Sequence, residues 1–353
     1  MKLNLKEKRE MRNYPEKGKK TSIAAILIAM VIMISGCGAN RPRWGYLPTA
    51  TLGNPFPDPN ELGTHSSGMG LFMEAAGLVY TCRGGHIDLD HVRGSADTTK
   101  YLAKKITETL AAKTEVFSFN MTGERSLHRI TFAYPENWQQ EPNKEKIIEQ
   151  ISIDTAPYIA MNAMTWHEIM TWFGVHFLGF EPEFNSAFSW EDIYSNLVGA
   201  KLGVAAMKDK EHSFDEAMTK LIYDALNELE VQSKKTAIAA SRSMEGKWYS
   251  AGIIPDMKMR NFDIGLDGEI TPTLVPDVAG CRECEPMTLK MPTVNTLKKY
   301  GFTMTHQIEP NVFEQDKILR AASSKVIFPE RHFPILIEFM KKEAQGKGYS
   351  FAE

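Results

Sequence analysis

A cluster of ionisable residues follows two glycines in the segment GGHIDLDHVR, residues 84–93. Asp88 and His91 are three positions apart, and His86 and Asp90 are four apart, so each pair would share one face of a helix. A carboxylate and an imidazole on one face can bind a divalent metal ion, or can act as a base and the group that orients it. The alternative is structural, because an aspartate at a helix N-terminus caps backbone amides and complements the helix dipole.

A second candidate is Glu168, in the segment TWHEIMTWFG. His167 and Glu168 match the start of the HExxH zinc-peptidase motif, but position 171 is Thr instead of the second His. His176 would lie on the opposite side of a continuous helix, so we exclude that enzyme class. The segment is otherwise apolar, and a buried glutamate requires a cation, a metal ion or a proton. We therefore predict a functional role for Glu168; the alternative is a surface glutamate on an amphipathic helix.

A third polar segment, NSAFSWEDIYSNL, occupies residues 185–197. Ser189 and Asp192 have the spacing of a capping box, with Ser189 as the N-cap of the following helix. The capping box leaves Ser186, Tyr194 and Asn196 unexplained, and these could line a polar cleft. We favour the structural interpretation for this segment.

Four cysteines occur in the chain. Cys281 and Cys284 form a single CxxC motif, which is weak support for zinc or for a thioredoxin-like site, so we expect a local disulfide or two free thiols. Cys82 could be a thiol nucleophile assisted by His86 or His91, but it does not lie clearly at a helix start that would lower its pKa. The disulfide state of Cys82, Cys281 and Cys284 stays open, and we expect no disulfide framework.

The first residues of the chain have the pattern of a secretory signal. Residues 1–20 contain eight Lys/Arg, and residues 23–34 are uninterrupted apolar, too short a run to span a bilayer. The run ends in Ile-Ser-Gly-Cys, which resembles the bacterial lipobox and implies lipid attachment at Cys37. Gly38 follows, without the aspartate that signals inner-membrane retention. We expect a lipid-anchored envelope protein, in the outer membrane and facing the periplasm if the cell is Gram-negative.

Removal of residues 1–36 takes away eight Lys/Arg and three Glu, so the formal net charge changes from −3 to −8. An acidic body argues against nucleic-acid binding and against a polybasic membrane surface. The expected partners are the membrane, through the lipid, and an envelope protein or a small molecule. With 43% hydrophobic and 10% aromatic residues, the chain can bury a large core.

The candidate residues must be positioned by helices and strands, and those expected from the sequence indicate an α+β fold. It consists of a mainly helical body with an inserted β-hairpin, and a smaller mixed C-terminal portion. We divide the chain into a signal (1–36), a Pro-rich tether (37–64), the body (65–245) and the mixed portion (246–353), the last two packed as one unit. The expected helices and strands follow from apolar periodicity and turn residues. They are helices at 68–82, 88–110, 146–173 (interrupted near Pro157), from Ser189, from Ser213 to about 241, 312–322 and 329–342; hairpins at 115–120 with 127–134 and at 261–266 with 269–275; and a strand at 302–308.

The lipobox together with GGHIDLDHVR, TWFG and SAFSWEDIYSN resembles an uncharacterised family of bacterial lipoproteins, domain of unknown function 4056. The resemblance covers most of residues 65–300 and implies export and a common fold, but no activity. The residues that coincide with the signatures of this family are Gly85, Asp88, His91, Arg93, Glu168, Thr171, Trp172, Gly174, Ser186, Phe188, Glu191, Asp192, Ser195 and Asn196.

Two functional hypotheses remain. The first is a binding or assembly protein of the cell envelope, in which the ionisable residues are caps and buried pairs. The alternative is a metal-assisted hydrolase, in which His91, Asp88 and Glu168 are both the catalytic residues and the ligands of a divalent metal such as zinc. Convergence of His91 and Glu168 within about 5 Å would favour a functional site.

Overall fold

The computed structural model describes residues 56–67, 74–121, 124–174, 176–177, 181–182, 186–250, 256–311 and 315–351. This part of the chain contains eight α-helices and several small sheets, which confirms the α+β class. Within the same ranges, no helix is both long enough and apolar enough to cross a membrane. The predicted signal peptide, Cys37 and residues 38–55 of the tether lie outside the described residues.

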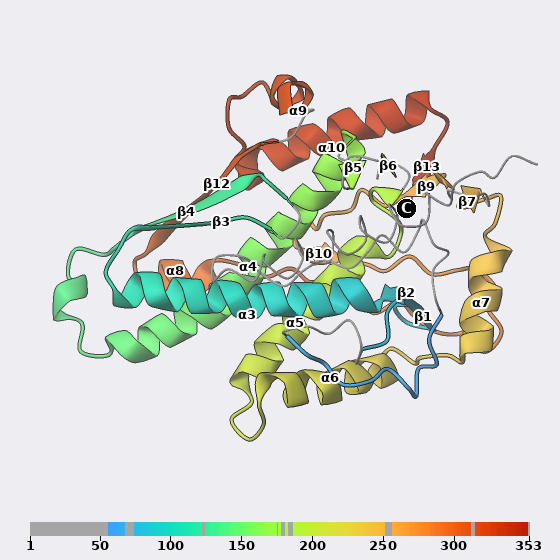
Figure 1. Cartoon of the computed structure of the whole chain (residues 1–353), viewed down its shortest axis with the longest axis horizontal. Helices are drawn as coiled ribbons and strands as arrows, with labels where there is room; N and C mark the ends of the chain where they lie inside the picture. Colours follow the sequence, from blue (N-terminus) through green and yellow to red (C-terminus); the bar gives the residue numbers. More distant parts are fainter. Residues whose placement is uncertain are drawn as a thin grey trace, which may run out of the picture. The chain divides into compact units, whose positions relative to one another are not determined.

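Three long helices form the centre of the fold: α3 (Leu89–Ala111), α4 (Lys144–Trp172) and α5 (Asp192–Lys208). Helix α3 packs against both α4 and α5 (Figure 1). The helix expected at 88–110 is confirmed. The interruption expected near Pro157 is wrong, because α4 continues through it. Fully buried residues on both sides of this proline, Ala156 and Ile159, anchor both halves of the helix, and this packing outweighs the lost backbone hydrogen bond.

Two glycines of α5 allow its backbone to contact α3 directly. A Cβ atom at Gly199 would lie 2.1 Å from the carbonyl oxygen of Val92, and one at Gly203 would lie 2.9 Å from that of Ala96. The contacts advance along both helices in the same direction, so α3 and α5 are parallel. Their positive N-terminal ends therefore lie at the same end of the pair.

A three-stranded antiparallel sheet has the order β12-β4-β3. Strands β3 (Val116–Phe119) and β4 (Leu127–Ala133) confirm the hairpin expected at 115–134. Strand β12 (Thr303–Glu309) confirms the strand expected at 302–308, and it pairs with β4 along its whole length. The buried face of this sheet shares a hydrophobic cluster with α3 and α4.

The residues before α3 form a β-hairpin, β1 (Leu78–Thr81) and β2 (Gly85–Asp88). The short helix expected at 68–82 is therefore wrong where the structure describes this segment. Gly85 has a positive φ of 67°, which suits the turn. Because His86 lies in β2 and Asp90 in α3, the expectation that they share a helix face is also wrong.

The single helix expected from Ser213 to about 241 is two helices, α6 (Phe214–Glu228) and α7 (Lys234–Ser243). The capping box at Ser213 is confirmed, with Glu216 as the reciprocal partner. The break follows α6 because Glu230 has a positive φ of 62° and its carbonyl oxygen accepts a hydrogen bond from the Cys82 backbone. Pairing with the β1 region therefore outweighs helix propensity here.

The C-terminal portion is mixed. Helices α9 (Gln315–Ala321) and α10 (Pro329–Gly346) match the expected ones, but the hairpin expected at 261–275 is wrong. Strand β10 (Glu269–Ile270) instead pairs with β11 (Leu289–Lys290), because the turn at Gly268 leads into a longer loop. The remaining short elements are η2 (Trp138–Gln140), β5 (His176–Phe177), β6 (Glu181–Pro182), β7 (Tyr249–Ser250), β8 (Asp256–Met257), β9 (Met259–Arg260), α8 (Asn295–Lys299) and β13 (Ser350–Phe351).

Candidate functional site

Side chains from three helices converge at one place. His91 in the first turn of α3, Glu168 near the end of α4 and Asp192 at the start of α5 each offer a ligand atom, and these atoms all lie within 4.8 Å of one another. Helix α4 crosses α3 obliquely and runs in the opposite general direction (Figure 1), so Glu168, near its C-terminal end, is placed close to the first turns of α3 and α5. The predicted meeting of His91 and Glu168 is thus found, with Asp192 as a third member.

Asp88 orients the His91 ring. Its Oδ2 lies 3.2 Å from His91 Nδ1, and on the other side of the ring His91 Nε2 lies 3.6 Å from Asp192 Oδ1. The other carboxylate oxygen of Asp88 accepts hydrogen bonds from the backbone amides of Asp90 and His91, at 2.7 Å and 3.3 Å. Asp88 is therefore both the N-cap of α3 and a contact of His91, which confirms the structural interpretation and leaves the functional one a prediction.

Glu168 is buried, with 3% of its surface exposed. Its Oε2 accepts a hydrogen bond of 2.7 Å from the backbone amide of Phe188, a residue with a φ of 55°. The fully buried Arg260 donates a hydrogen bond to the neighbouring carbonyl oxygen of Ala187. The loop before α5 thus holds Glu168 in place.

Asp192 has one oxygen for the backbone and one for the site. Its Oδ2 accepts a 3.0 Å hydrogen bond from the Ser189 amide, while Oδ1 faces His91. The prediction that Ser189 is the N-cap is wrong, because the N-cap of α5 is Glu191. The first turn of α5 begins later than the capping-box spacing indicated.

Burial is the strongest influence on the ionisation of the site. It raises the pKa of Asp90 to about 8 and that of Glu191 to about 7, and the charge of Asp88 adds to both shifts. Burial and the charge of Glu168 raise the pKa of Asp192 well above its usual range. For His91, burial favours the neutral ring, but Asp192 and Asp88 outweigh it and raise the pKa well above its usual value. The site therefore crowds buried carboxyl groups whose charged forms are disfavoured unless a cation lies beside them.

Buried polar atoms around the three helices have no hydrogen-bond partner within the described ranges. Both amide atoms of Asn196, which is 1% exposed, belong to this group, as do Thr171 Oγ1 and Glu191 Oε2. Asn196 is one helical turn after Asp192 on the same face of α5. Unpartnered buried polar atoms are rare in folded proteins and often mark a bound ion or water. By contrast, the Tyr194 hydroxyl has a partner, because it donates to the Met287 carbonyl oxygen. This contact gives no support to the cleft role considered for Tyr194.

Other residues considered from the sequence lie outside this site. His86 is buried, burial lowers its pKa to about 4, and its Nδ1 accepts a 3.4 Å hydrogen bond from Trp190 Nε1. His167 Nδ1 lies 2.7 Å from Glu124 Oε1. Cys82 forms a disulfide with Cys281, which excludes the thiol-nucleophile interpretation and corrects the expectation of a local disulfide or free thiols.

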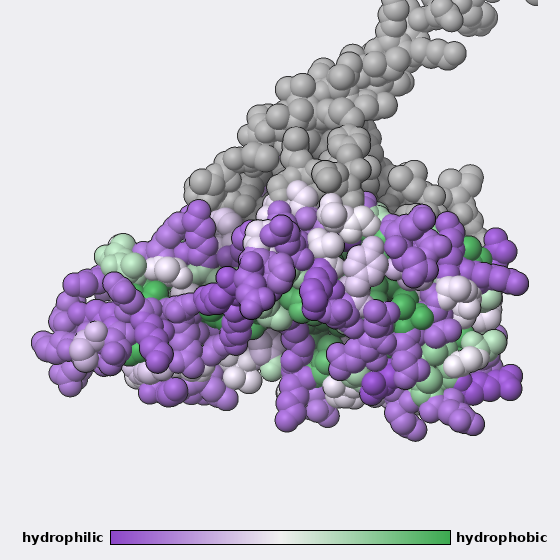
Figure 2. Space-filling view, turned by 90° about the horizontal axis from the view of Figure 1, so that it is seen from below, coloured by the Kyte–Doolittle hydropathy of each residue, from purple (hydrophilic) through white to green (hydrophobic). Residues whose placement is uncertain are grey.

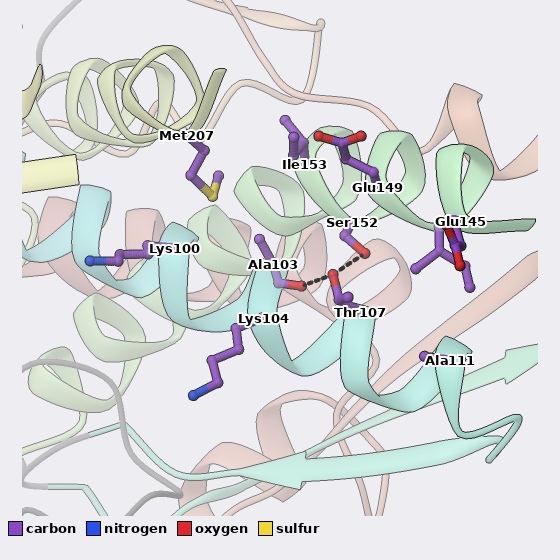
Figure 3. A pocket seen from close by; sticks show the side chains of 11 residues that line it. Lys100, Ala103, Lys104, Thr107, Ala111, Glu145, Glu149, Ser152, Ile153 and Met207 are labelled. Atoms are coloured by element: carbon purple, nitrogen blue, oxygen red, sulfur yellow. Dashed lines mark hydrogen bonds between the residues drawn. The ribbon is translucent and has the colours of Figure 1, made fainter. Parts of the chain in front are cut away.

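Two surface pockets lie apart from the His91 site. The pocket in Figure 3, of about 420 Å³, is lined by α3, α4 and α5 residues such as Lys100, Ile148 and Met207. Thr107 of α3 donates a hydrogen bond to Ser152 Oγ of α4 at 2.9 Å and so joins these two helices at the pocket. The second, of about 520 Å³, includes Trp172 and residues of α9 and α10. Hydrophilic residues cover most of the face shown in Figure 2, with hydrophobic residues in small separate areas.

Asp192 and Glu191 were missed as site residues because the capping-box spacing offered a sufficient structural explanation. The sequence signal that could have found them is the density of polar residues. The segment carries two adjacent carboxylates and Asn196, and a second acidic cluster lies at residues 88–90. Only the parallel packing of α3 and α5 brings the two clusters together.

Comparison with known proteins gives a family and no activity. No curated protein and no solved structure matches the chain. The model of a family described as a protein of unknown function (DUF4056) matches residues 47–276. Because this match covers more than half of the chain, the protein belongs to the DUF4056 family.

Proposed function

We propose that the protein is a lipid-anchored protein of the cell envelope that binds a divalent cation between His91, Glu168 and Asp192 and acts as a metal-assisted hydrolase. The observation that carries the proposal is the convergence of these three ligand groups, from three helices, within 4.8 Å. One imidazole and two carboxylates suit zinc or manganese, and three protein ligands leave coordination positions open.

The surroundings fit a cation. Asp88 faces the Nδ1 side of His91, the arrangement by which a carboxylate orients a metal-binding histidine. The unpartnered Asn196 amide and Glu191 Oε2 supply further polar atoms around the site. The His91 side chain is 29% exposed, so the group of ligands is accessible from the surface at this residue.

A divalent cation here would lower the pKa of a bound water and stabilise negative charge on a substrate oxygen. The role of the chain would be to fix the three ligands on rigid helices, with Asp88 holding the His91 ring and the Phe188 amide holding Glu168. Rigid positioning of this kind limits the rearrangement that catalysis would otherwise require.

The burial of Glu168 and Asp192 favours a second candidate function, a binding or assembly protein in which the cation is structural. The two candidates differ in what removal of the cation does. A structural ion stabilises the fold, so chelation should unfold the protein. A catalytic ion leaves a folded protein that has lost only its activity.

The proposal predicts that zinc or manganese raises the melting temperature of the metal-free protein, because a ligand that binds only the folded state stabilises it. Calorimetric titration with each metal should give about one site per chain. Asp192→Asn and His91→Ala should lower the affinity at least tenfold, since each removes a ligand. Melting curves and calorimetry measure both effects.

Two exposed residues provide matched controls. Glu108→Gln and His212→Ala make comparable changes of charge and size outside the site and should leave metal affinity unchanged. If wild type binds neither metal, and its melting temperature is the same with and without them, the cation site is wrong. If metal binds, hydrolysis of p-nitrophenyl acetate and of p-nitrophenyl phosphate is measured for the metal-loaded protein beside the chelated protein. Hydrolysis that is lost on chelation of a folded protein supports the hydrolase.

A further inference from the structure

Three cysteines lie together at the end of β1, away from the His91 site. Cys82, which is fully buried, forms the disulfide with Cys281. Cys284 is free and half-buried. The Sγ atoms of Cys82 and Cys284 and a carboxylate oxygen of Glu230 all lie within 4.8 Å of one another. A free thiol thus lies beside an existing disulfide.

The backbone holds these groups in place. The Cys284 amide donates to the Cys281 carbonyl oxygen at 3.2 Å, a turn that brings the second cysteine of the CxxC motif back toward the first. The Cys82 amide donates to the Glu230 carbonyl oxygen at 3.1 Å. The Cys284 thiol in turn donates to Glu230 Oε2 at 3.2 Å. Both the thiol and its carboxylate partner are therefore fixed relative to the disulfide.

We propose that this group is a thiol–disulfide exchange site, in which Cys284 displaces Cys281 from Cys82. Cys284 loses its proton to solvent, and its thiolate sulfur attacks Cys82 Sγ. A Cys82–Cys284 bond forms as the Cys82–Cys281 bond breaks, and Cys281 leaves as a thiolate that takes up a proton. One disulfide and one thiol are present before and after, so the step needs no external oxidant or reductant.

Glu230 controls the rate of this exchange. Its hydrogen bond raises the pKa of the Cys284 thiol, which keeps the group protonated at neutral pH. The thiolate is the attacking species, so the exchange accelerates as pH rises. The same loop reaches α5, because the Met287 carbonyl accepts a hydrogen bond from the Tyr194 hydroxyl. Exchange moves the covalent attachment of this loop by three residues.

The exchange is measured on the full chain by peptide mapping. The protein is held at pH 6 or pH 8.5, quenched with acid, alkylated with N-ethylmaleimide under denaturing conditions and digested with trypsin. Cleavage after Arg282 separates Cys281 from Cys284, so the two disulfides give different peptides. We expect Cys82–Cys284 chains with alkylated Cys281 to accumulate severalfold faster at pH 8.5. Cys82–Cys281 alone, with Cys284 fully alkylated at both pH values, would overturn the proposal.

Variants separate exchange from accidental oxidation. Glu230→Gln should speed the exchange severalfold at pH 7, because an uncharged amide does not repel the thiolate as the carboxylate does. An unchanged rate would contradict the role of Glu230. Cys281→Ser, treated with glutathione disulfide, should form Cys82–Cys284; glutathione adducts alone on a folded variant would count against the site. If this variant does not fold, the wild-type map at the two pH values decides. Cys284→Ser should retain only Cys82–Cys281.

Discussion

At the scale of single residues, Asp88 makes two contacts, a helix cap and a contact with an imidazole, that the sequence presents as alternatives. One of its oxygens caps α3 and the other faces His91. The helix start and the position of the imidazole therefore depend on the same carboxylate. The sequence alone does not reveal this arrangement, because one carboxylate oxygen contacts the backbone amides and the other contacts the imidazole.

A second residue-scale feature is the buried pair of His128 in β4 and His306 in β12, whose rings are joined by a 3.1 Å hydrogen bond between Nδ1 and Nε2. Burial, together with the nearby His306 for His128, lowers the pKa of His128 well below its usual value, and burial lowers that of His306 to about 3. Both rings are thus neutral in the folded protein. The unfolded chain takes up protons on them near pH 6.5.

This pair predicts acid sensitivity. Between pH 6.5 and the lowered pKa values the unfolded state binds more protons, so the unfolding free energy decreases as pH falls, by up to about 1.4 kcal/mol per pH unit for each ring. His306→Gln should make this dependence shallower. Urea unfolding at pH 7, 6 and 5 measures the slope. The exposed His212 provides the control, and equal slopes for wild type and His306→Gln would contradict the assignment.

At the scale of elements, the separation of α3 and α5 depends on Gly199. An alanine Cβ there would lie 2.1 Å from the Val92 carbonyl oxygen, so the helices must move apart. Gly199→Ala should lower the unfolding free energy by about 1–3 kcal/mol, the usual cost of overpacking. It should also weaken metal binding at the proposed site, because His91 and Asp192 lie on these two helices.

Gly94 on α3 is the matched control, since a Cβ there meets no atom within 4 Å. Gly94→Ala should raise the unfolding free energy by about 0.5–1 kcal/mol, because alanine is the better helix former. Urea unfolding measures both variants. A neutral Gly199→Ala variant with normal metal affinity would show that the close approach of the helices does not position the site.

The elements that were predicted correctly have strong local signals. Residues 89–111 and 144–172 repeat apolar residues at helical spacing, and strands β3 and β4 alternate around a turn. The errors occur where distant contacts decide. The segment before Cys82 is apolar enough for a helix, but it pairs with β2, and the helix after Ser213 ends where Glu230 meets Cys82. The site shows the same limit: His91 and Glu168 stood out as residue types, whereas Asp192 joins them only through helix packing.

At the scale of the whole molecule, the lipid proposed at Cys37 would determine where the protein resides. Cys37→Ser should abolish lipid attachment and move the protein from the membrane fraction to the soluble fraction, because a lipid chain supplies the membrane affinity. Metabolic labelling with a fatty acid and fractionation measure this. Cys284→Ser is the control and should stay in the membrane fraction. Wild-type protein in the inner membrane would contradict the outer-membrane assignment.

The folded unit extends beyond the residues that define the family. The family match ends at residue 276, yet Cys281 bonds to Cys82, β12 pairs with β4, and β13 pairs with β9. A chain that ends at 276 would lack β12, so one edge of β4 would have no strand beside it. Such an edge promotes aggregation.

The late position of β12 also matters while the chain is being made. Strand β4 can pair with β3 as soon as residue 133 has emerged, but its other edge waits for residues 303–309. Cys82 waits for Cys281 across a separation of 199 residues in the same way. Because chains are synthesised from the N-terminus, the unfinished protein carries an open sheet edge and an unpaired thiol together. Its need for chaperones should therefore be greatest until residue 281 arrives, and the sheet edge stays open until residues 303–309 follow.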